Sequence, residues 1–172
     1  MRYLTIVRHA KAEPANVGEN DVDRVLSTRG RHQASKLREW VKDPEELGHY
    51  GPVTALVSAA ARTRETYSVA FAGTAFVHAV ETSELIYNGR RDVSAEDLLA
   101  HLAAIDPVTE SLLVVGHNPT VFELATMLAS SPIKILSKGK YPLGAAIVLE
   151  IDETALIGPG PYRLVTTFVP EV

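Results

Sequence analysis

The sequence predicts an α/β protein, a three-layer α/β/α sandwich around a mostly parallel central sheet. Short runs of β-branched and aliphatic residues alternate along the chain with longer segments of helical period, which is the pattern of strand–helix repeats. One run, SLLVVG at 111–116, is apolar throughout, as expected of a central strand that helices cover on both faces. No internal repeat or long linker interrupts this pattern, so residues 1–172 are expected to form one domain.

The strands are predicted from short apolar runs that end in turn residues or in polar residues. In the C-terminal third, several glycines and prolines separate such runs, which indicates strands joined by turns. The six predicted strands are 2–8, 53–58, 74–79, 111–116, 145–151 and 162–168.

Four segments between these strands are predicted to be helices. Ser94 followed by Asp97 resembles a capping box, in which each side chain bonds the other residue's backbone N–H, ahead of the apolar run LLAHLAAI. The segment AAARTRETYSVAFA follows the second strand, and TVFELATMLA follows a proline. The four helices are expected to begin at Ser27 or Thr28, near Ser58 as an N-cap, at Ser94 and after Pro119.

The composition excludes several classes of function. The 46% hydrophobic and 22% charged residues are typical of a globular protein, and no apolar run is long enough for a membrane span. The chain has no cysteine, which excludes disulfides, thiolate catalysis and cysteine-based metal sites. A net charge of −4 argues against non-specific nucleic-acid binding. No signal peptide is visible, so a cytoplasmic protein without nucleic-acid or membrane partners is expected; the oligomeric state is not predicted.

Polar residues follow three of the predicted strands at the point where each strand ends. Arg8 and His9 end the first strand, Arg62 lies in the first turn of the helix after the second strand, and His117 follows SLLVVG. The carboxyl ends of parallel strands meet at one edge of a sheet, where ligands of such folds bind. We therefore expect two imidazoles and two guanidiniums to meet at this edge.

This set of side chains fits phosphoryl transfer. A neutral imidazole is a nucleophile toward phosphorus, and adjacent cations favour its neutral form. Two guanidiniums can bind the oxygens of a phosphoryl group, together with the backbone N–H groups of helix N-termini. A second imidazole can hydrogen-bond the same oxygens. No carboxylate or third histidine completes a metal site in the pattern, so neither a metal nor an organic cofactor is expected.

Four motifs in order carry a resemblance to a known family. VRHA, DRVLSTRGRHQA, VSAAARTRET and VVGHNP, which together span 7–119, resemble the motifs of the histidine phosphatase superfamily, whose fold is called phosphoglycerate mutase-like. The resemblance implies that His9 is the phosphorylated nucleophile and that Arg8, Arg62 and His117 form the phosphate pocket. It is closest to the short bacterial phosphohistidine phosphatases of the SixA type, because the chain has no room for a large capping insertion and because NDVDRVLSTRG is similar to their Asp-x-x-Arg-x-Leu-x-x-x-Gly segment.

The sequence also departs from the family pattern. Ala10 stands where the family has glycine after the histidine, which would be strained if the backbone there needs a positive φ. Ala59 stands where many members have proline.

Other residues near these motifs are candidates for supporting roles. Many members of the superfamily use a carboxylic acid to protonate the leaving oxygen, and Glu84 is the candidate for this role, with Glu81 as its rival. The remaining candidates are Ser58 and Asn118, which can bind substrate, Lys11, which can supply a donor, and Arg24, which fits either an ion pair or the pocket rim.

The sequence thus predicts a phosphatase that acts through a covalent phosphohistidine intermediate, with phosphohistidine in proteins as its substrate. Expelling imidazole from phosphorus is easier than expelling an alkoxide, so such an enzyme can work with a weaker acid. Two alternatives stay open: a phosphomonoesterase on a small phosphorylated metabolite, and a non-catalytic phosphate-binding module.

Overall fold

The computed structural model describes residues 1–89 and 92–172, and a mixed six-stranded sheet lies at its centre. The strand order is β3-β2-β4-β1-β5-β6. Strands β3, β2, β4 and β1 pair in parallel, and β5 is antiparallel to both β1 and β6. The predicted α/β fold with a mostly parallel sheet is confirmed. The strands are β1 (Arg2–Arg8), β2 (Val53–Ser58), β3 (Val77–Ser83), β4 (Ser111–Gly116), β5 (Ala146–Ile151) and β6 (Arg163–Phe168).

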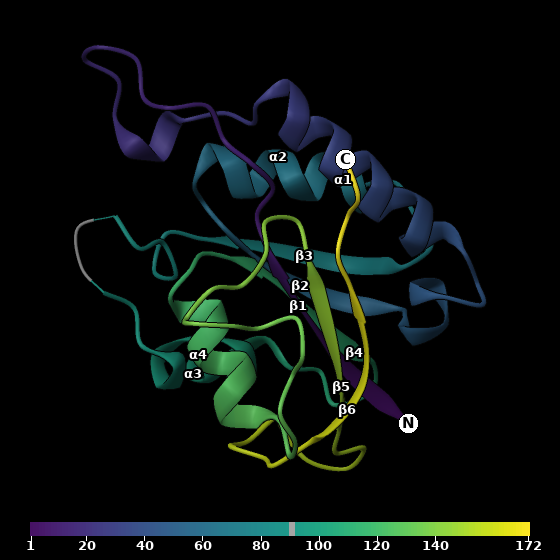
Figure 1. The fold of residues 1–172 in the computed structure, drawn as a ribbon. Coiled ribbons are helices and arrows are strands. Elements are labelled where there is room, and N and C mark those ends of the chain that lie inside the picture. The colour runs from purple at the N-terminus through teal and green to yellow at the C-terminus, as the bar shows by residue number, and fades with distance from the viewer. Residues whose placement is uncertain (90–91) are drawn as a thin grey trace.

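Helices cover both faces of the sheet and form the outer two layers. Figure 1 shows α1 and α2 on one face and α3 and α4 on the other. Two short 3-10 helices lie in connecting segments, η1 before α1 and η2 before β2. The helices are α1 (Thr28–Lys42), α2 (Ala61–Ala70), α3 (Ala95–Ile105) and α4 (Thr120–Leu128), with η1 at Asp21–Asp23 and η2 at Leu47–Tyr50.

Alternate residues of the central strands fill two separate hydrophobic cores. Leu4 and Ile6 of β1 pack in the core on the α3–α4 side, whereas Tyr3 and Val7 pack in the core on the α1–α2 side. The same alternation holds in β4, whose six residues are all buried. Burial on both faces explains why the sequence of β4 is a continuous apolar run.

Two of the predicted boundaries were wrong. The third strand runs from Val77 to Ser83 instead of 74–79, because Thr74 donates its hydroxyl to Phe71 O at 2.6 Å and so continues the turn that ends α2. The helix after β2 has Ala60 as its N-cap, and Ser58 is the last residue of the strand. The caps predicted at Ser27 and Ser94 are confirmed.

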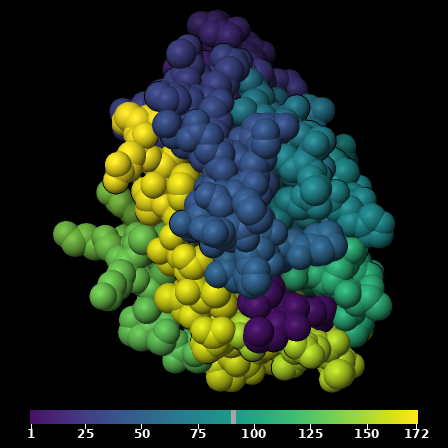
Figure 2. Space-filling model, turned by 90° about the vertical axis from the view of Figure 1, so that its right-hand side faces the viewer, coloured from purple at the N-terminus to yellow at the C-terminus, as the bar shows by residue number. Residues whose placement is uncertain are grey.

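The C-terminal segment packs against α1. Phe168 of β6 stacks on Trp40, with their ring centroids 4.6 Å apart. Figure 2 shows this segment, in yellow, running beside the blue segment that contains α1 and η2. Within residues 1–89 and 92–172, no helix has both the length and the apolar character needed to cross a bilayer.

Candidate active site

The sheet brings the two predicted histidines together at its carboxyl edge. Strand β1 pairs with β4 so that Arg8 lies opposite Gly116, and the next residues of the two strands are His9 and His117. Their ring centroids are 5.3 Å apart, and His9 N–H donates to Gly116 O at 3.1 Å. A cavity of about 340 Å³ opens here, and the side chains that line it are almost all polar. It is lined by Arg8, His9, Lys11, Ala12, Arg24, Arg62, Asn88, His117, Asn118 and Leu143.

His9 is held as a neutral imidazole with a defined tautomer. Its side chain is buried, and Nδ1 lies 2.7 Å from Ala10 O. A carbonyl oxygen only accepts, so Nδ1 carries the proton and Nε2 keeps its lone pair. Burial lowers the pKa of His9 to about 3, and Arg62, Arg8 and Arg24 contribute to this shift. At neutral pH the ring therefore has the protonation state of a nucleophile.

His117 is held in the opposite tautomer. Its Nε2 lies 2.7 Å from Ser58 Oγ, and Oγ is 3.5 Å from the N–H of Ala60, a weak donor at that distance. Nε2 is the only acceptor within hydrogen-bond distance of the Ser58 hydroxyl among the described residues, so the hydroxyl donates to Nε2 and the ring proton lies on Nδ1. Nδ1 is buried and has no partner among the described residues. Burial lowers the pKa of His117 to about 2, with contributions from His9 and Arg62. The neutral ring thus offers an unused N–H donor beside His9.

The two predicted phosphate-binding arginines also line the cavity. Arg8 donates from Nη1 to Tyr141 O at 2.7 Å, and its buried Nε has no partner among the described residues. Arg62, in the first turn of α2, donates to the backbone oxygen and the carboxylate of Asp21 at 2.9 and 3.1 Å. Burial lowers the pKa of Arg8, and so does the like charge of Arg62, because two nearby guanidiniums repel each other. An anion between them would relieve this repulsion.

The supporting candidates divide into those at the cavity and those elsewhere. Arg24 realises both predicted possibilities, because it lines the cavity and also forms an ion pair with Asp21 at 3.0 Å. Asn118 and Lys11 line the cavity too, and Asn118 Oδ1 is buried without a partner among the described residues. Ser58 contacts His117 instead of capping α2.

The structure does not bring Glu84 to the cavity. Its side chain is exposed just after β3, and no carboxylate is among the described residues that line the cavity. Its rival Glu81 is an exposed residue of β3 itself. The proton-donor role of either residue therefore stays a prediction.

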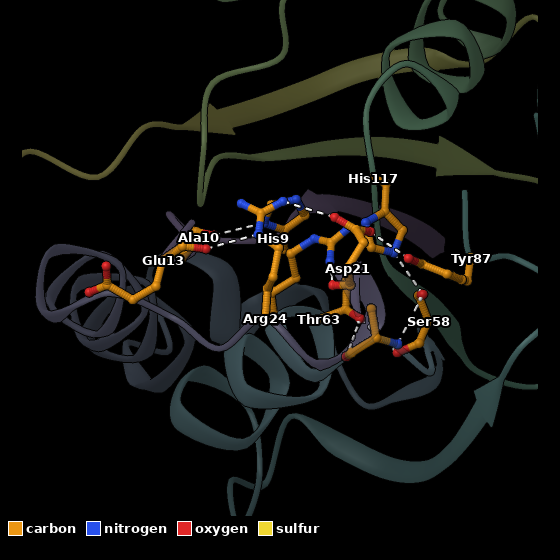
Figure 3. Close-up of polar contacts among 11 residues, drawn as sticks. His9, Ala10, Glu13, Asp21, Arg24, Ser58, Thr63, Tyr87 and His117 are labelled. Carbon is orange, nitrogen blue, oxygen red and sulfur yellow. Dashed lines mark hydrogen bonds and ion pairs between the residues drawn. The ribbon is translucent and has the colours of Figure 1, made fainter. Parts of the chain in front are cut away.

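Two residues that the sequence reasoning did not single out lie beside the site. Asp21 of η1 contacts Arg62 and Arg24, and the Tyr87 hydroxyl donates a short hydrogen bond to the Asp21 carboxylate (Figure 3). The ring of Tyr87 packs edge-on against His117 at 5.6 Å. The spacing of Asp21 and Arg24 within NDVDR could have pointed to Asp21, whereas no local signal marks Tyr87.

Both departures from the family pattern fit this backbone. Ala10 is not among the residues with positive φ, and its N–H donates to Thr66 Oγ1 at 3.0 Å, so alanine is tolerated there. The N–H of Ala59 donates to Ser83 O at 3.0 Å and links the ends of β2 and β3, a bond that proline could not form. Among the residues described, no group of three histidine, aspartate or glutamate side chains could hold a metal ion.

Comparisons with known proteins give relatives over the whole chain. No protein-family model matches it. An uncharacterised chloroplastic protein of Arabidopsis thaliana is 28% identical over 177 residues, which cover 99% of this chain and 78% of that protein. A solved structure named as the phosphohistidine phosphatase SixA of Agrobacterium tumefaciens has a TM-score of 0.76 and 26% identity, over 98% of this chain and 99% of that one. The corresponding SixA of Nakamurella multipartitia has a TM-score of 0.75 and 25% identity, over 99% and 97%.

The chain has the histidine phosphatase fold. The resemblance to SixA-type proteins that the four motifs predicted is confirmed, and these neighbours are phosphatases. Proteins with this fold are named for other substrates as well. A phosphoserine phosphatase of Entamoeba histolytica has a TM-score of 0.61 and 13% identity, over 97% of this chain and 96% of that one. The fold therefore supports phosphatase activity but does not identify the substrate.

Proposed function

We propose that the protein is a phosphatase that works through a covalent phosphohistidine intermediate on His9, and that its substrate is phosphohistidine in a protein. The observation that carries this proposal is the pair of buried neutral histidines. His9 has a free Nε2 lone pair and His117 a free Nδ1–H, in one cavity that Arg8 and Arg62 also line. A nucleophile, a hydrogen-bond donor and two phosphate-binding cations are the groups that phosphoryl transfer requires.

In the first proposed step the Nε2 lone pair of His9 attacks phosphorus, and the bond from phosphorus to the leaving group breaks. Arg8, Arg62 and the Nδ1–H of His117 bind the phosphoryl oxygens, on which negative charge gathers. In the second step a water oxygen attacks phosphorus and the bond to His9 breaks. His9 still carries its Nδ1 proton, donated to Ala10 O, so it leaves as a neutral imidazole and the water proton passes to solvent.

The same reasoning favours phosphohistidine as the substrate. An imidazole whose second ring nitrogen is protonated leaves phosphorus as a neutral molecule, whereas an alkoxide needs a proton from an acid. No carboxylic acid is among the described residues that line the cavity, and Glu84 is exposed elsewhere. The lining therefore suits a leaving group that needs no acid. The expected cytoplasmic location and the expected lack of nucleic-acid partners stay predictions.

A phosphomonoesterase on a small metabolite is the second candidate. Lys11 and Arg24 line the cavity in addition to the two arginines proposed to bind the phosphoryl group. These extra cations could bind further anionic groups of a small substrate, and a phosphoserine phosphatase shares the fold.

A substrate panel separates the two candidates. Phosphate release is measured from a phosphohistidine protein, phosphoramidate, phosphoserine and p-nitrophenyl phosphate, with wild type, His9→Ala and the matched control His32→Ala, whose residue is exposed on α1. The proposal expects faster turnover of the two P–N substrates, loss of all turnover in His9→Ala, wild-type rates in His32→Ala, and an acid-labile phosphate on His9. Faster turnover of phosphoserine would favour the second candidate, and full activity of His9→Ala would refute the mechanism.

A further inference from the structure

Asp21 forms hydrogen bonds with three side chains around the proposed phosphate pocket, namely Arg62, Arg24 and Tyr87. Arg62 donates from Nη1 to the backbone oxygen of Asp21 at 2.9 Å and from Nη2 to Oδ2 at 3.1 Å. Arg24 donates to Oδ1 at 3.0 Å, and the Tyr87 hydroxyl donates to Oδ2. Figure 3 shows Asp21 between Arg24 on one side and Tyr87 and His117 on the other. One residue therefore connects the two arginines with the tyrosine that packs on His117.

Asp21 is not a proton donor in this arrangement. Burial raises the pKa of its carboxyl group, but the hydrogen bonds from Tyr87, Arg24 and Arg62 outweigh burial and lower this pKa to about 2. The carboxylate is therefore ionised at neutral pH and only accepts. The pKa of Tyr87 is raised by burial and by Asp21, so its hydroxyl keeps its proton and serves as the donor to Asp21.

Asp21 also leaves Arg62 able to bind an anion. A guanidinium has five N–H donors in a fixed plane, and only two of those on Arg62 go to Asp21. The side chain of Arg62 is only 7% exposed, so its orientation is set by the groups around it. Its guanidinium also lies 5.7 Å from the centroid of the Tyr87 ring, which confines it on a further side. The remaining donors can meet a phosphoryl group while Asp21 stays in place.

We propose that Asp21 is a positioning residue of the phosphate pocket, which fixes Arg62 and Arg24 in the orientation that binds the phosphoryl oxygens and is itself fixed by Tyr87. This inference rests on the proposed function, because it concerns the same pocket. A positioning role and a purely electrostatic role of Asp21 predict opposite changes in phosphate affinity when the carboxylate is removed. A carboxylate beside an anion site repels phosphate, so its neutralisation alone would strengthen phosphate binding, whereas loss of Arg62 orientation would weaken it.

The test compares Asp21→Asn with Asp23→Asn, a matched control on the same turn of η1, and with Tyr87→Phe. Asp23→Asn removes the same charge from the loop, but among the described residues no hydrogen bond or ion pair joins the Asp23 side chain to Arg62 or Arg24. Vanadate binding is measured by calorimetry, and kcat and KM are measured with phosphoramidate. We expect Asp21→Asn to lower both vanadate affinity and kcat/KM by about 100-fold, the size of a misplaced binding group. Tyr87→Phe should produce a smaller loss of the same kind, and Asp23→Asn should stay within about twofold of wild type.

A double-mutant cycle with Arg62→Ala makes the test specific. If Asp21 acts through Arg62, Asp21→Asn should have little further effect on vanadate affinity in the Arg62→Ala background. Unchanged or tighter vanadate binding by Asp21→Asn, or losses that simply add in the double variant, would overturn the role of Asp21. Wild-type protein that binds no vanadate and hydrolyses no substrate would overturn the proposed function itself.

Discussion

The two buried histidines should make the stability of the protein depend on pH in a measurable way. Burial lowers the pKa of His9 to about 3 and that of His117 to about 2, and Arg62 and Arg8 contribute to both shifts. In the unfolded chain a histidine has a pKa of about 6.5. Below that pH the unfolded state binds two protons that the folded state does not bind. The free energy of unfolding that the two neutral histidines contribute above about pH 6.5 is therefore lost as the pH falls toward 3.

The size of the loss at pH 5 depends only on the unfolded chain. Both folded pKa values lie well below 5, so lowering the pH from about 7.5 to about 5 costs about 2 kcal/mol for each histidine and about 4 kcal/mol for the two together. Asp21 adds little in this window. Its pKa is lowered from 3.8 to about 2, so the stability that it contributes is lost only below about pH 4.

Urea unfolding at these two pH values tests the reasoning. The free energy of unfolding is measured for wild type, His9→Gln, His117→Gln and, as a matched control, His32→Gln at an exposed position. Only the change with pH is compared, so a general effect of each substitution on stability cancels. We expect each buried substitution to reduce the pH-dependent loss by about 2 kcal/mol, and His32→Gln to leave most of it in place. Equal pH dependence in wild type and His9→Gln would show that His9 has the same pKa in the folded and the unfolded protein, and would refute the argument that burial keeps the His9 ring neutral.

Three further predictions concern the pocket. Arg62→Lys keeps a charge but loses the planar donors, so kcat with phosphoramidate should fall by about 10²- to 10³-fold, while Arg64→Lys on the exposed face of α2 should leave kcat unchanged. Glu84 and Glu81 are exposed and do not line the cavity, so Glu84→Gln and Glu81→Gln should each leave phosphoramidate and phosphoester hydrolysis unchanged; a loss of kcat/KM confined to phosphoesters in either variant would show that this residue is the proton donor and would contradict the argument about the leaving group. Phosphate release should continue in EDTA and be inhibited by vanadate or tungstate, and activity that is lost to EDTA and restored by a divalent ion would count against the mechanism.

The four main residues that the sequence predicted for the site lie at strand ends or in the first helical turn after one. A buried strand is marked by its apolar run, and the residue after the run is placed by the sheet without any detailed packing. His9 and His117 follow two such runs, and the pairing of β1 with β4 then brings them together. Arg62 could be placed because it lies in the first turn after β2.

The parts that the sequence did not predict depend on side chains meeting across the fold. Ser58 is a good N-cap residue in local sequence, but its hydroxyl contacts His117, which lies far along the chain. Asp21 and Tyr87 come from two different loops and meet only in the folded protein. The shifted start of β3 has the same kind of cause, because Phe76 is buried beside Phe71 although TAFVHA has the local composition of a strand.

The proposed site therefore combines a firmly held nucleophile, His9, with an arginine that a loop contacts. The Arg8–His9 segment is fixed by backbone bonds on both sides, since His9 N–H donates to Gly116 O and Gly144 N–H lies 3.1 and 3.2 Å from the oxygens of Arg8 and His9. Gly144 has a φ of +72°, and an added Cβ would lie 3.1 Å from Pro170, so glycine permits this close approach.

Arg62, in contrast, takes its orientation from a side chain of η1, in the loop that joins β1 to α1. Substitutions in that loop can change how a phosphoryl group is bound without moving His9. The position of His9 and the orientation of Arg62 thus depend on separate parts of the chain, and the Asp21 and Asp23 variants would measure the contribution of the loop.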